Sequence, residues 1–263
     1  LKMNISIVSI IIPCFNSEST LFETLNSILK QTFSNWEAII VDDGSNDDTK
    51  SISESFTLKD KRFKYYYKKN EGLGKARNYG IERAEGEFIL PLDSDNLVDS
   101  EFCELAIEIF KSKNIGVVHG HAELFGEKSG LWHIEKFNFE KLLVQNYIDA
   151  CAIFRKSLWE QVGGYDEKMP HQGNEDWELW LSFGRLGVEF FHLNKVTFKY
   201  RIRTNSMIRQ YTRVIKQLNE DYIATKYAKE YRQIYLKYRK RELRRENNPL
   251  ASTIFFFKKF LKL

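Results

Sequence analysis

The sequence contains only three cysteines among its 263 residues, and Cys14, Cys103 and Cys151 lie far apart. They form no C-x-x-C pair and no cysteine–histidine spacing typical of zinc sites. Neither a disulfide framework nor a structural zinc site is therefore expected. Such low cysteine usage is typical of a reducing compartment, which predicts a cytoplasmic location.

Long apolar runs are also absent. The opening run, residues 5–12, is eight residues long, is interrupted by serines and ends at Pro13. A membrane-spanning helix needs about 20 apolar residues, so this run predicts a buried strand rather than a secretory signal or a span. The chain has no internal repeat and no low-complexity linker, and a hydrophobic content of 43% is ample for a packed core.

Charge is distributed unevenly along the chain. The net charge is +4, yet from Tyr211 onward 14 Lys/Arg stand against 5 Asp/Glu, which leaves residues 1–210 with a net charge of −5. Because a domain usually has about 100 to 200 residues, the length allows one large domain and an appendage. We predict a catalytic domain over residues 1–210 and a basic amphipathic helical extension over 211–263, where apolar residues recur near helical spacing.

Strand-like and helix-like segments alternate along the first 125 residues. Strands are expected over 6–13, 36–41, 63–67, 88–92 and 115–119, and helices over 17–30, 49–56, 74–84 and 101–111. Further strands are expected over 149–155 and 196–202, with a helix over 174–184 whose first residue, Asn174, is the expected cap. Such alternation predicts an α/β fold with a mainly parallel sheet flanked by helices.

Polar clusters follow three of these expected strands. They are Cys14-Phe15-Asn16, Asp42-Asp43-Gly44 and Asp93-Ser94-Asp95. In open α/β sheets, ligands bind beyond the carboxyl ends of the strands. We therefore expect the three clusters to converge on one site.

The run Asp93-Ser94-Asp95 is a candidate metal site. Two carboxylates at positions i and i+2, just past a strand, can point into one pocket. Mg²⁺ and Mn²⁺ prefer carboxylate oxygens and take one or two from the protein, with phosphates and water as the other ligands. The alternative is a simple turn, because D-S-D-N is also good turn sequence. The buried strand before the run favours the metal interpretation.

Two other segments have the chemistry to bind a nucleotide. A carboxylate at Asp42 or Asp43 can accept a hydrogen bond from a ring N–H of uracil, thymine or guanine, although helix capping is an alternative role. The segment 70–78 combines glycines with Lys75 and Arg77, which suit phosphate. It matches neither of the common phosphate-loop patterns.

The pair Glu175-Asp176 is the candidate for acid–base chemistry. At a helix N-terminus the helix dipole favours ionised carboxylates, so Asp176 is expected to be anionic near neutral pH. An anionic carboxylate can take the proton of an attacking sugar hydroxyl. The alternative is ordinary helix-start chemistry. Trp177 and Trp180 in the same helix are expected to be core residues rather than sugar platforms.

Arginines and hydroxyls gather after the last expected strand, at Arg201, Arg203, Asn205 and Ser206. Arginine suits a diphosphate because its planar donors bind two oxygens at once. A strand with solvated arginines is the alternative. His119 and His121 share one face of a strand, but no third ligand accompanies them, so we interpret them as structural.

Seven motifs appear in a characteristic order. They are V-S-I-I-I-P-C-F-N (8–16), V-D-D-G-S-N-D-D-T (41–49), N-E-G-L-G-K-A-R-N-Y-G-I (70–81), G-E-F-I-L-P-L-D-S-D-N (86–96), V-G-G-Y-D-E (162–167), N-E-D-W-E-L-W-L (174–181) and Y-R-I-R-T-N-S-M (200–207). Together they resemble family 2 of the inverting glycosyltransferases, which have the GT-A fold. The resemblance covers about three quarters of the chain.

This resemblance implies a binding site for a nucleotide-sugar donor. The residues that would bind the nucleotide are Pro13, Phe15 and Glu18 around the nucleoside, Asp43 on the base, and Asn70 and Arg77. In the D-S-D run, Asp93 would bind the ribose side with Ser94 beside it, and Asp95 and Asp93 would ligate Mn²⁺ or Mg²⁺. Asn96 stands where many relatives carry Asp, which weakens the case for a third metal ligand.

The resemblance also implies the catalytic groups. Asp176 would be the catalytic base, with Glu175 beside it, and Arg203 and Ser206 would close over the diphosphate. The expected reaction is a single in-line displacement that moves a hexosyl group, with a UDP-sugar favoured as donor, to a glycan or lipid-linked hydroxyl. A role in the synthesis of cell-surface polysaccharide or glycoconjugates is implied by the family alone.

Two other functions compete with this one. A catalytically degenerate sugar-nucleotide-binding partner is disfavoured by the retained carboxylates Asp93, Asp95, Glu175 and Asp176. A sugar-nucleotide pyrophosphorylase is disfavoured because no glycine-rich basic loop follows the first strand.

The basic tail ends in aromatic residues mixed with lysines. Such a tail suits an anionic membrane surface, with the enzyme peripheral on the inner face of the cell membrane, and the alternative is packing on the catalytic domain or in a homodimer. Nucleic acid is not an expected partner, because the strand-end pocket is acidic.

Overall fold

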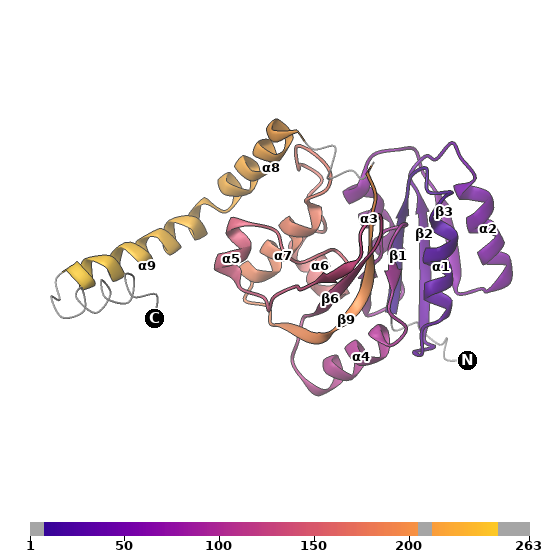
Figure 1. Cartoon of the computed structure of the whole chain (residues 1–263), viewed down its shortest axis with the longest axis horizontal. Helices are drawn as coiled ribbons and strands as arrows, with labels where there is room; N and C mark the ends of the chain where they lie inside the picture. The colour runs from indigo at the N-terminus through magenta and orange to yellow at the C-terminus, as the bar shows by residue number, and fades with distance from the viewer. Residues whose placement is uncertain (1–7, 205–211, 247–263) are drawn as a thin grey trace. The chain divides into compact units, whose positions relative to one another are not determined.

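The computed structural model of the chain describes residues 8–204 and 212–246. The chain divides into two compact units, Leu1–Asn219 and Glu220–Leu263. The first unit is built on one mixed sheet, which has nine strands among the described residues (Figure 1).

One half of the sheet is parallel, in the order β3-β2-β1-β4. These strands are β1 (Val8–Cys14), β2 (Trp36–Asp42), β3 (Phe63–Tyr67) and β4 (Phe88–Pro91). Every residue of β1, β2 and β4 is buried. Continuous burial is expected for parallel strands whose two faces are both covered by helices, and it explains why these segments are mainly apolar.

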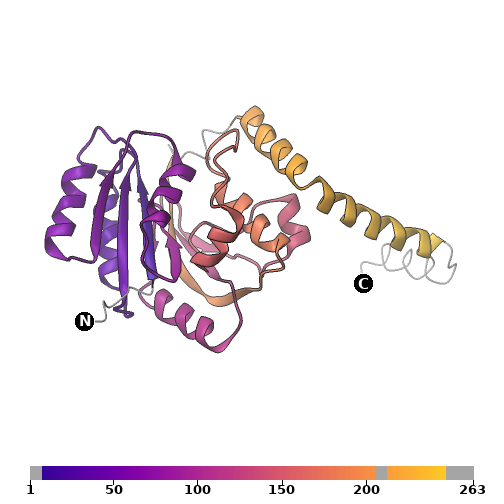
Figure 2. The same ribbon diagram turned by 180° about the vertical axis from the view of Figure 1, so that it is seen from behind.

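Helices cover both faces of this parallel half. They are α1 (Leu21–Leu29), α2 (Thr49–Lys59), α3 (Leu73–Glu82) and α4 (Phe102–Ser112). α1 and α2 share a face, where the rings of Phe22 and Phe56 meet edge-on at 5.6 Å, and α3 lies on the other face (Figures 1 and 2). α3 sits close against β1 and β2 because Gly80 has no side chain: a Cβ there would come within 2.6 Å of Ile11.

The other half of the sheet contains antiparallel pairs. It continues from β4 as β8-β6-β9-β5, with β7 paired to β6. The strands are β5 (Leu97–Val98), β6 (Val117–Gly126), β7 (Gly130–Trp132), β8 (Ile153–Arg155) and β9 (Phe190–Ile202). β8 runs antiparallel to both β4 and β6, whereas β6 and β9 are parallel. The predicted α/β architecture is therefore present, with a mixed sheet.

β9 begins at Phe190, earlier than the sequence predicts, and β5 and β7 were not predicted. The polar pair Asn194-Lys195 looks like a strand boundary in the sequence. In the structure it lies at an irregularity in the register between β6 and β9, near His119 and His121. A bulge places extra residues in one strand without ending it, which is why the polar pair does not stop β9.

Three helices follow β7: α5 (Phe139–Val144), α6 (Lys156–Val162) and α7 (Glu175–Arg185). α7 packs its aromatic residues inward. The Nε1–H of Trp177 donates to the carbonyl of Leu142 at 2.6 Å, and the ring of Trp180 meets that of Phe154 edge-on at 5.8 Å. Both tryptophans are buried, so they are core residues as predicted.

Four histidines pack together beside β6 and β9. The ring centroids of His119 and His192 are 5.0 Å apart, and those of His121 and His133 are 4.3 Å apart. Burial lowers the pKa of His119 to about 3, so this imidazole is neutral at physiological pH. In the described part of the chain, no three His, Cys, Asp or Glu side chains form a group able to hold a metal ion. These histidines pack against one another, and the structural interpretation of His119 and His121 stays a prediction.

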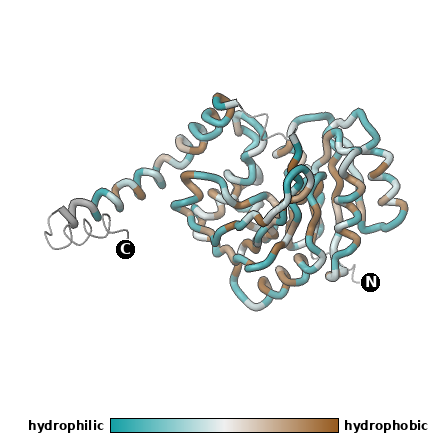
Figure 3. The backbone as a smooth tube through the Cα atoms, viewed as in Figure 1, coloured by the Kyte–Doolittle hydropathy of each residue, from teal (hydrophilic) through white to brown (hydrophobic). Residues whose placement is uncertain are grey.

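Beyond residue 211 the chain forms α8 (Arg213–Lys226) and α9 (Ala228–Glu246). The single helical pattern in the sequence thus corresponds to two helices, along which hydrophobic and hydrophilic positions alternate (Figure 3). None of the helices described in the structure combines the length and the apolar composition needed to cross a membrane.

Candidate active site

A cavity of about 820 Å³ lies at the edge of the sheet where β1, β2 and β4 end. Pairing of Ile11 with Pro91 and of Cys14 with Asp42 brings these strand ends to one edge. Most of the predicted site residues line the cavity: Pro13, Phe15, Asp43, Asn70, Arg77, Asp93, Ser94, Asp95, Glu175, Asp176 and Arg203. The expected convergence of the three strand-end clusters is thus present.

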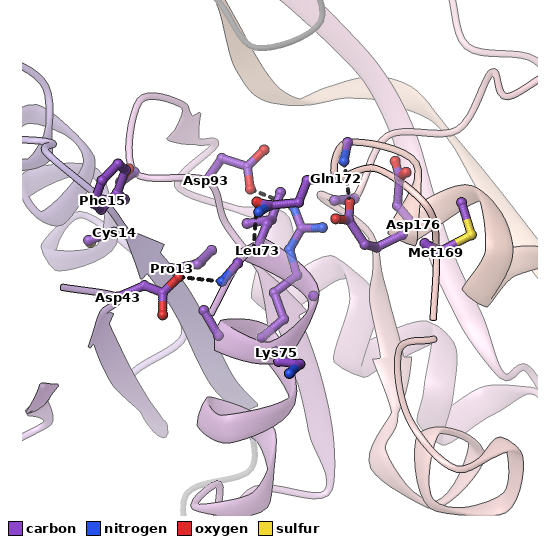
Figure 4. A pocket seen from close by; sticks show the side chains of 18 of the residues that line it. Pro13, Cys14, Phe15, Asp43, Leu73, Lys75, Asp93, Met169, Gln172 and Asp176 are labelled. Carbon is purple, nitrogen blue, oxygen red and sulfur yellow. Dashed lines mark hydrogen bonds and ion pairs between the residues drawn. The ribbon is translucent and has the colours of Figure 1, made fainter. Parts of the chain in front are cut away.

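Asp93 and Asp176 face the same space in the cavity (Figure 4). They come from opposite parts of the chain: Asp93 follows β4, and Asp176 lies in the first turn of α7. The predicted metal-binding run and the predicted base therefore open onto one cavity.

Asp43 holds the loop between β3 and α3. Its carboxylate accepts the backbone N–H groups of Glu71 at 3.0 Å and Gly72 at 2.8 Å, and the Nζ of Lys68 at 2.8 Å. Gly72 has a φ of 103°, a conformation that glycine adopts without strain. A carboxylate offers about four acceptor positions, so one remains for a ligand N–H.

Arg77 is the buried cation of the site. Only 2% of it is exposed, and its Nη2 lies 2.6 Å from Oδ1 of Asp93. Its guanidinium is 5.5 Å from the ring centroid of Tyr165, and its charge also interacts with Glu175 and Asp176. Arg77 was predicted to contact the nucleotide. The structure places it against the carboxylates in the wall of the cavity, and its Nε has no hydrogen-bond partner among the described residues. Its contact with a nucleotide stays a prediction.

Asp95 is paired with Arg203, whose Nη2 lies 2.5 Å from Oδ2 of the carboxylate. Burial and the nearby charge of Asp93 raise the pKa of Asp95, although Arg203 opposes the shift. Asn96 turns away from the cavity: it is 2% exposed, and its Oδ1 accepts the N–H of Arg201 at 3.0 Å. The residue that departs from the family pattern therefore ties the loop to β9.

Ser94 joins the D-S-D run to the segment between β1 and α1. Its hydroxyl lies 2.8 Å from that of Ser17, and its carbonyl accepts the hydroxyl of Thr20 at 2.9 Å. These bonds fasten the D-S-D run to the start of α1.

Asp176 is held by two donors. Its Oδ1 accepts the backbone N–H of Trp177 at 2.8 Å and the Nδ2 of Asn146 at 3.2 Å. Burial raises the pKa of Asp176 to about 6, with Arg77 opposing the rise and Glu175 adding to it. The sequence predicts an anion stabilised by the helix dipole, and the structure shows that burial outweighs this effect. Asp176 is still mainly ionised at pH 7.

Glu175 is buried beside Asp176, with 3% of it exposed. Its Oε2 accepts the N–H of Gly173 at 2.7 Å. Burial raises the pKa of Glu175, and Arg77 opposes this shift. The two carboxyl groups and Arg77 therefore form one interacting cluster.

Two predicted residues are not placed in the cavity. Glu18 is not among its lining residues: its Oε2 accepts the N–H of Asp48 at 3.0 Å, at the start of α2. The side chain of Glu18 therefore helps to cap a helix. Ser206 lies outside the described residues.

Several lining residues were missed by the sequence analysis. Asp149, Tyr200 and the loop 166–173 line the cavity without belonging to any expected binding cluster. Gln172 in this loop accepts the N–H of Leu73 through Oε1 at 2.9 Å, 99 residues away in the sequence (Figure 4). No local sequence pattern reports a contact of this kind.

Comparison with known families and proteins gives one family. The family model described as Glycosyl transferase family 2 matches residues 9–163. An uncharacterized glycosyltransferase of Rickettsia typhi is 33% identical over 222 residues, which cover 78% of this chain and 68% of that protein. Glycosyltransferase GlyG of Streptococcus pneumoniae is 32% identical, over 77% of this chain and 73% of its own length. The chain spans only about 30% of some longer relatives, such as one from Rickettsia bellii (29%).

Solved structures share the fold. The TarS fragment 1–349 of S. aureus in complex with UDP-GlcNAc superposes with a TM-score of 0.69 at 23% identity, covering 81% of this chain and 64% of that chain. A mannosyltransferase from Pyrobaculum calidifontis, in complex with GDP-Man and Mn²⁺, gives a TM-score of 0.61 at 18% identity, covering 76% and 58%. At these identities the likeness concerns the fold alone.

Proposed function

The chain belongs to glycosyltransferase family 2, and on that premise we propose that it transfers a hexosyl group from a nucleotide-diphosphate donor to a hydroxyl group of a glycan or glycolipid. A UDP-sugar is the favoured donor, the transfer inverts the anomeric configuration, and Mn²⁺ or Mg²⁺ is the cofactor. The observation that carries this proposal is that Asp93, Asp95 and Asp176 line one cavity.

The nucleoside is proposed to bind at the β1–β2 side of the cavity. Phe15 is 51% exposed and offers a ring face, and Asp43 retains an acceptor position for a base N–H. Pro13 and Asn70 line the same part of the cavity. Uracil has a ring N–H suited to the remaining acceptor of Asp43.

A divalent cation fits the chemistry of this cavity. Nine acidic residues line it, against Lys75, Arg77 and Arg203 as its lysine and arginine residues. A diphosphate would be repelled from so acidic a cavity unless a cation came with it. One oxygen each of Asp93 and Asp95 is paired with an arginine, and the second oxygen of each has no hydrogen bond within the described residues. These oxygens would hold the cation, with the diphosphate and water completing its ligands.

When bound, the cation would neutralise charge on the departing diphosphate. Arg203 would serve the same purpose: it pairs with Asp95, lines the cavity, and 43% of its side chain is exposed. Arg77 stays with Asp93 and keeps the donor-side carboxylate in place. In this proposal, Arg203 stabilises the leaving group, and Arg77 holds the carboxylate of Asp93 in place.

Asp176 is proposed to take the proton from the attacking hydroxyl group. A pKa of about 6 keeps the carboxylate ionised at neutral pH and makes it a stronger base than an ordinary Asp. Its hydrogen bonds to Trp177 and Asn146 fix its orientation. No covalent intermediate is needed, because the hydroxyl attacks the anomeric carbon directly on the face opposite the diphosphate.

The test is a panel of nucleotide sugars with Mn²⁺, measured by thermal stabilisation and by release of nucleoside diphosphate. Asp176→Asn should keep nucleotide binding and lose transfer by at least about a hundredfold, the usual scale for loss of a general base. Asp95→Ala should abolish metal-dependent nucleotide binding. Normal turnover of D176N would remove Asp176 from its role, and an unchanged Mn²⁺ titration of D95A would remove Asp95 from the metal site.

The acceptor and location proposals rest on the family and on the basic extension. We propose that the catalytic domain includes the predicted residues 1–210 and extends to Asn219, where the first compact unit ends, and that the basic segment after it brings the enzyme, peripherally, to an anionic membrane surface. The aromatic end of this segment, residues 254–263, lies outside the described residues. Liposome co-sedimentation of the full chain and of a chain ending at 246 tests this idea, and equal binding would exclude the tail as anchor.

A further inference from the structure

Asp149 is a carboxyl group in the cavity to which the proposed mechanism gives no task. It lies in the segment between α5 and β8, outside every motif that carries the family resemblance. Its neighbour Ala150 also lines the cavity.

Strand topology places Asp149 beside the D-S-D run. β8 runs antiparallel to β4, with Phe88 opposite Arg155 and Ile89 opposite Phe154. The segment that enters β8 therefore lies at the edge where β4 ends. Asp149 lines the same cavity as Asp93, Ser94 and Asp95, and its charge interacts with that of Asp93.

The same segment also reaches the proposed base. Asn146, three residues before Asp149, donates to Asp176 at 3.2 Å. The charge of Asp149 interacts with those of both Asp93 and Asp176, and burial together with these two charges raises its pKa to about 8. Asp149 thus lies near both the donor side and the acceptor side of the reaction.

The backbone holds the Asp149 side chain and leaves part of it available. Oδ1 accepts the N–H of Cys151 at 2.8 Å, and the turn is tightened by the N–H of Ala152, which donates to the carbonyl of Ala150 at 2.7 Å. Among the described residues, no hydrogen bond or ion pair engages Oδ2. A structural turn residue would need only Oδ1.

We propose that Asp149 hydrogen-bonds a hydroxyl group of the sugar being transferred and so helps to select the donor. This inference rests on the proposed function. In an in-line displacement, the sugar ring must lie between the diphosphate at Asp93 and Asp95 and the attacking hydroxyl at Asp176. Asp149 is an additional carboxyl group that the fold places near both the diphosphate side and the attacking hydroxyl. A carboxyl group can bond a hydroxyl in either protonation state, as acceptor or as donor.

The test compares Asp149→Ala and Asp149→Asn with Asp166→Ala, a matched control in which an acidic residue at another part of the lining is truncated. Three quantities are measured with Mn²⁺: the Kd for UDP, the rate of UDP-sugar hydrolysis without acceptor, and the ratio of kcat/KM for the best UDP-hexose and its C4 epimer. We expect D149A to lower hydrolysis by about fivefold, the scale of one lost hydrogen bond between uncharged groups, and to reduce the epimer ratio. The Kd for UDP should stay within about twofold, and D149N should retain more activity than D149A, because an amide still bonds hydroxyl groups.

Three results would overturn the inference: unchanged hydrolysis and epimer ratio in D149A, an equal loss of UDP binding, or the same changes in D166A. If D149A does not fold, D149N decides alone through its epimer ratio, which should change by at least about threefold. Failure of the proposed function has a different signature, because the wild-type enzyme would then turn over no nucleotide sugar at all.

Discussion

Two effects of opposite sign act on the carboxyl group of Asp176. The N-terminus of α7 favours the anion, and burial in the cavity favours the neutral acid. Burial is the larger effect, so the pKa rises to about 6, even though Arg77 opposes the rise. The balance suits a general base, which must be ionised at the working pH and yet bind a proton firmly.

This pKa predicts the acid limb of the activity profile. Because the base must be ionised, kcat/KM should fall as the pH drops through about 6, with a slope corresponding to one proton. Initial rates between about pH 5 and about pH 8, at saturating Mn²⁺, measure this limb. Activity that is constant down to about pH 5 would rule out a base with this pKa.

The same shift predicts an effect on stability. The folded pKa of Asp176 lies above the value of about 3.9 expected in the unfolded chain, so ionisation at neutral pH destabilises the folded state. Asp176→Asn removes that cost and should raise the thermal midpoint by a few degrees at about pH 7.5. The gain should shrink near pH 4, where the wild-type carboxyl group is protonated in the folded protein. A lower midpoint for D176N at neutral pH would contradict this account.

At the scale of elements, the start of α7 is held by a residue from α8. Asn174 is at the N-cap position of α7, as predicted, but its side chain accepts no N–H of that helix. Its Oδ1 instead accepts Nδ2 of Asn219 at 2.9 Å. Asn219 also bonds both backbone groups of His171, accepting its N–H at 3.0 Å and donating to its carbonyl at 3.1 Å. A fully buried side chain thus ties α8 to the loop that precedes Glu175 and Asp176.

Loss of this contact should affect turnover more than nucleotide binding. Asn219→Ala should lower kcat by about tenfold, since the loop that positions α7 loses three hydrogen bonds, each worth about 1 kcal/mol. The Kd for UDP should stay within about twofold, because Asp43 and residues 13–16 are held by other elements. Thr225→Ala, a truncation at an exposed position of α8, is the control and should retain full activity. Equal kcat values for the two variants would show that the contact does not position the base.

At the scale of the whole molecule, the first compact unit extends beyond the predicted domain boundary. Sequence composition changes near residue 211, whereas the unit reaches Asn219. Ile215 lines the cavity, and Asn219 holds its loop. Charge composition changes where the solvent-exposed residues change, whereas the extent of a compact unit depends on which side chains are buried. The two boundaries therefore need not fall at the same residue.

Truncation distinguishes these two boundaries. A chain ending at residue 210 should lose most transferase activity, because Ile215 and Asn219 are removed. A chain ending at Lys226 should keep its metal-dependent UDP binding and at least about a third of its turnover, because α8 stays intact. Both chains are assayed beside the full chain. Equal turnover in the two truncated forms would place the boundary near residue 210.

Local patterns were sufficient for a large part of this protein. Runs rich in apolar and aromatic residues predicted β1, β2, β3 and β4 to within two residues over the described part of the chain, because parallel strands packed under helices are mainly apolar. The seven motifs predicted the family and the GT-A fold, and both are confirmed. The roles of Asp95 and Asp176, the donor and the metal stay predictions, although both side chains line the expected cavity.

Only the tertiary structure decided which distant side chains meet. The fold brings Asp149 into the cavity with the D-S-D run, and the ion pair with Asp93 gives Arg77 a counter-charge that its own sequence neighbours do not indicate. Burial also set the pKa of Asp176 against the direction that its helix position favours. The reason is physical: strand and helix propensity depend on residues close in sequence, whereas strand order, burial and charge pairing depend on residues brought together through space.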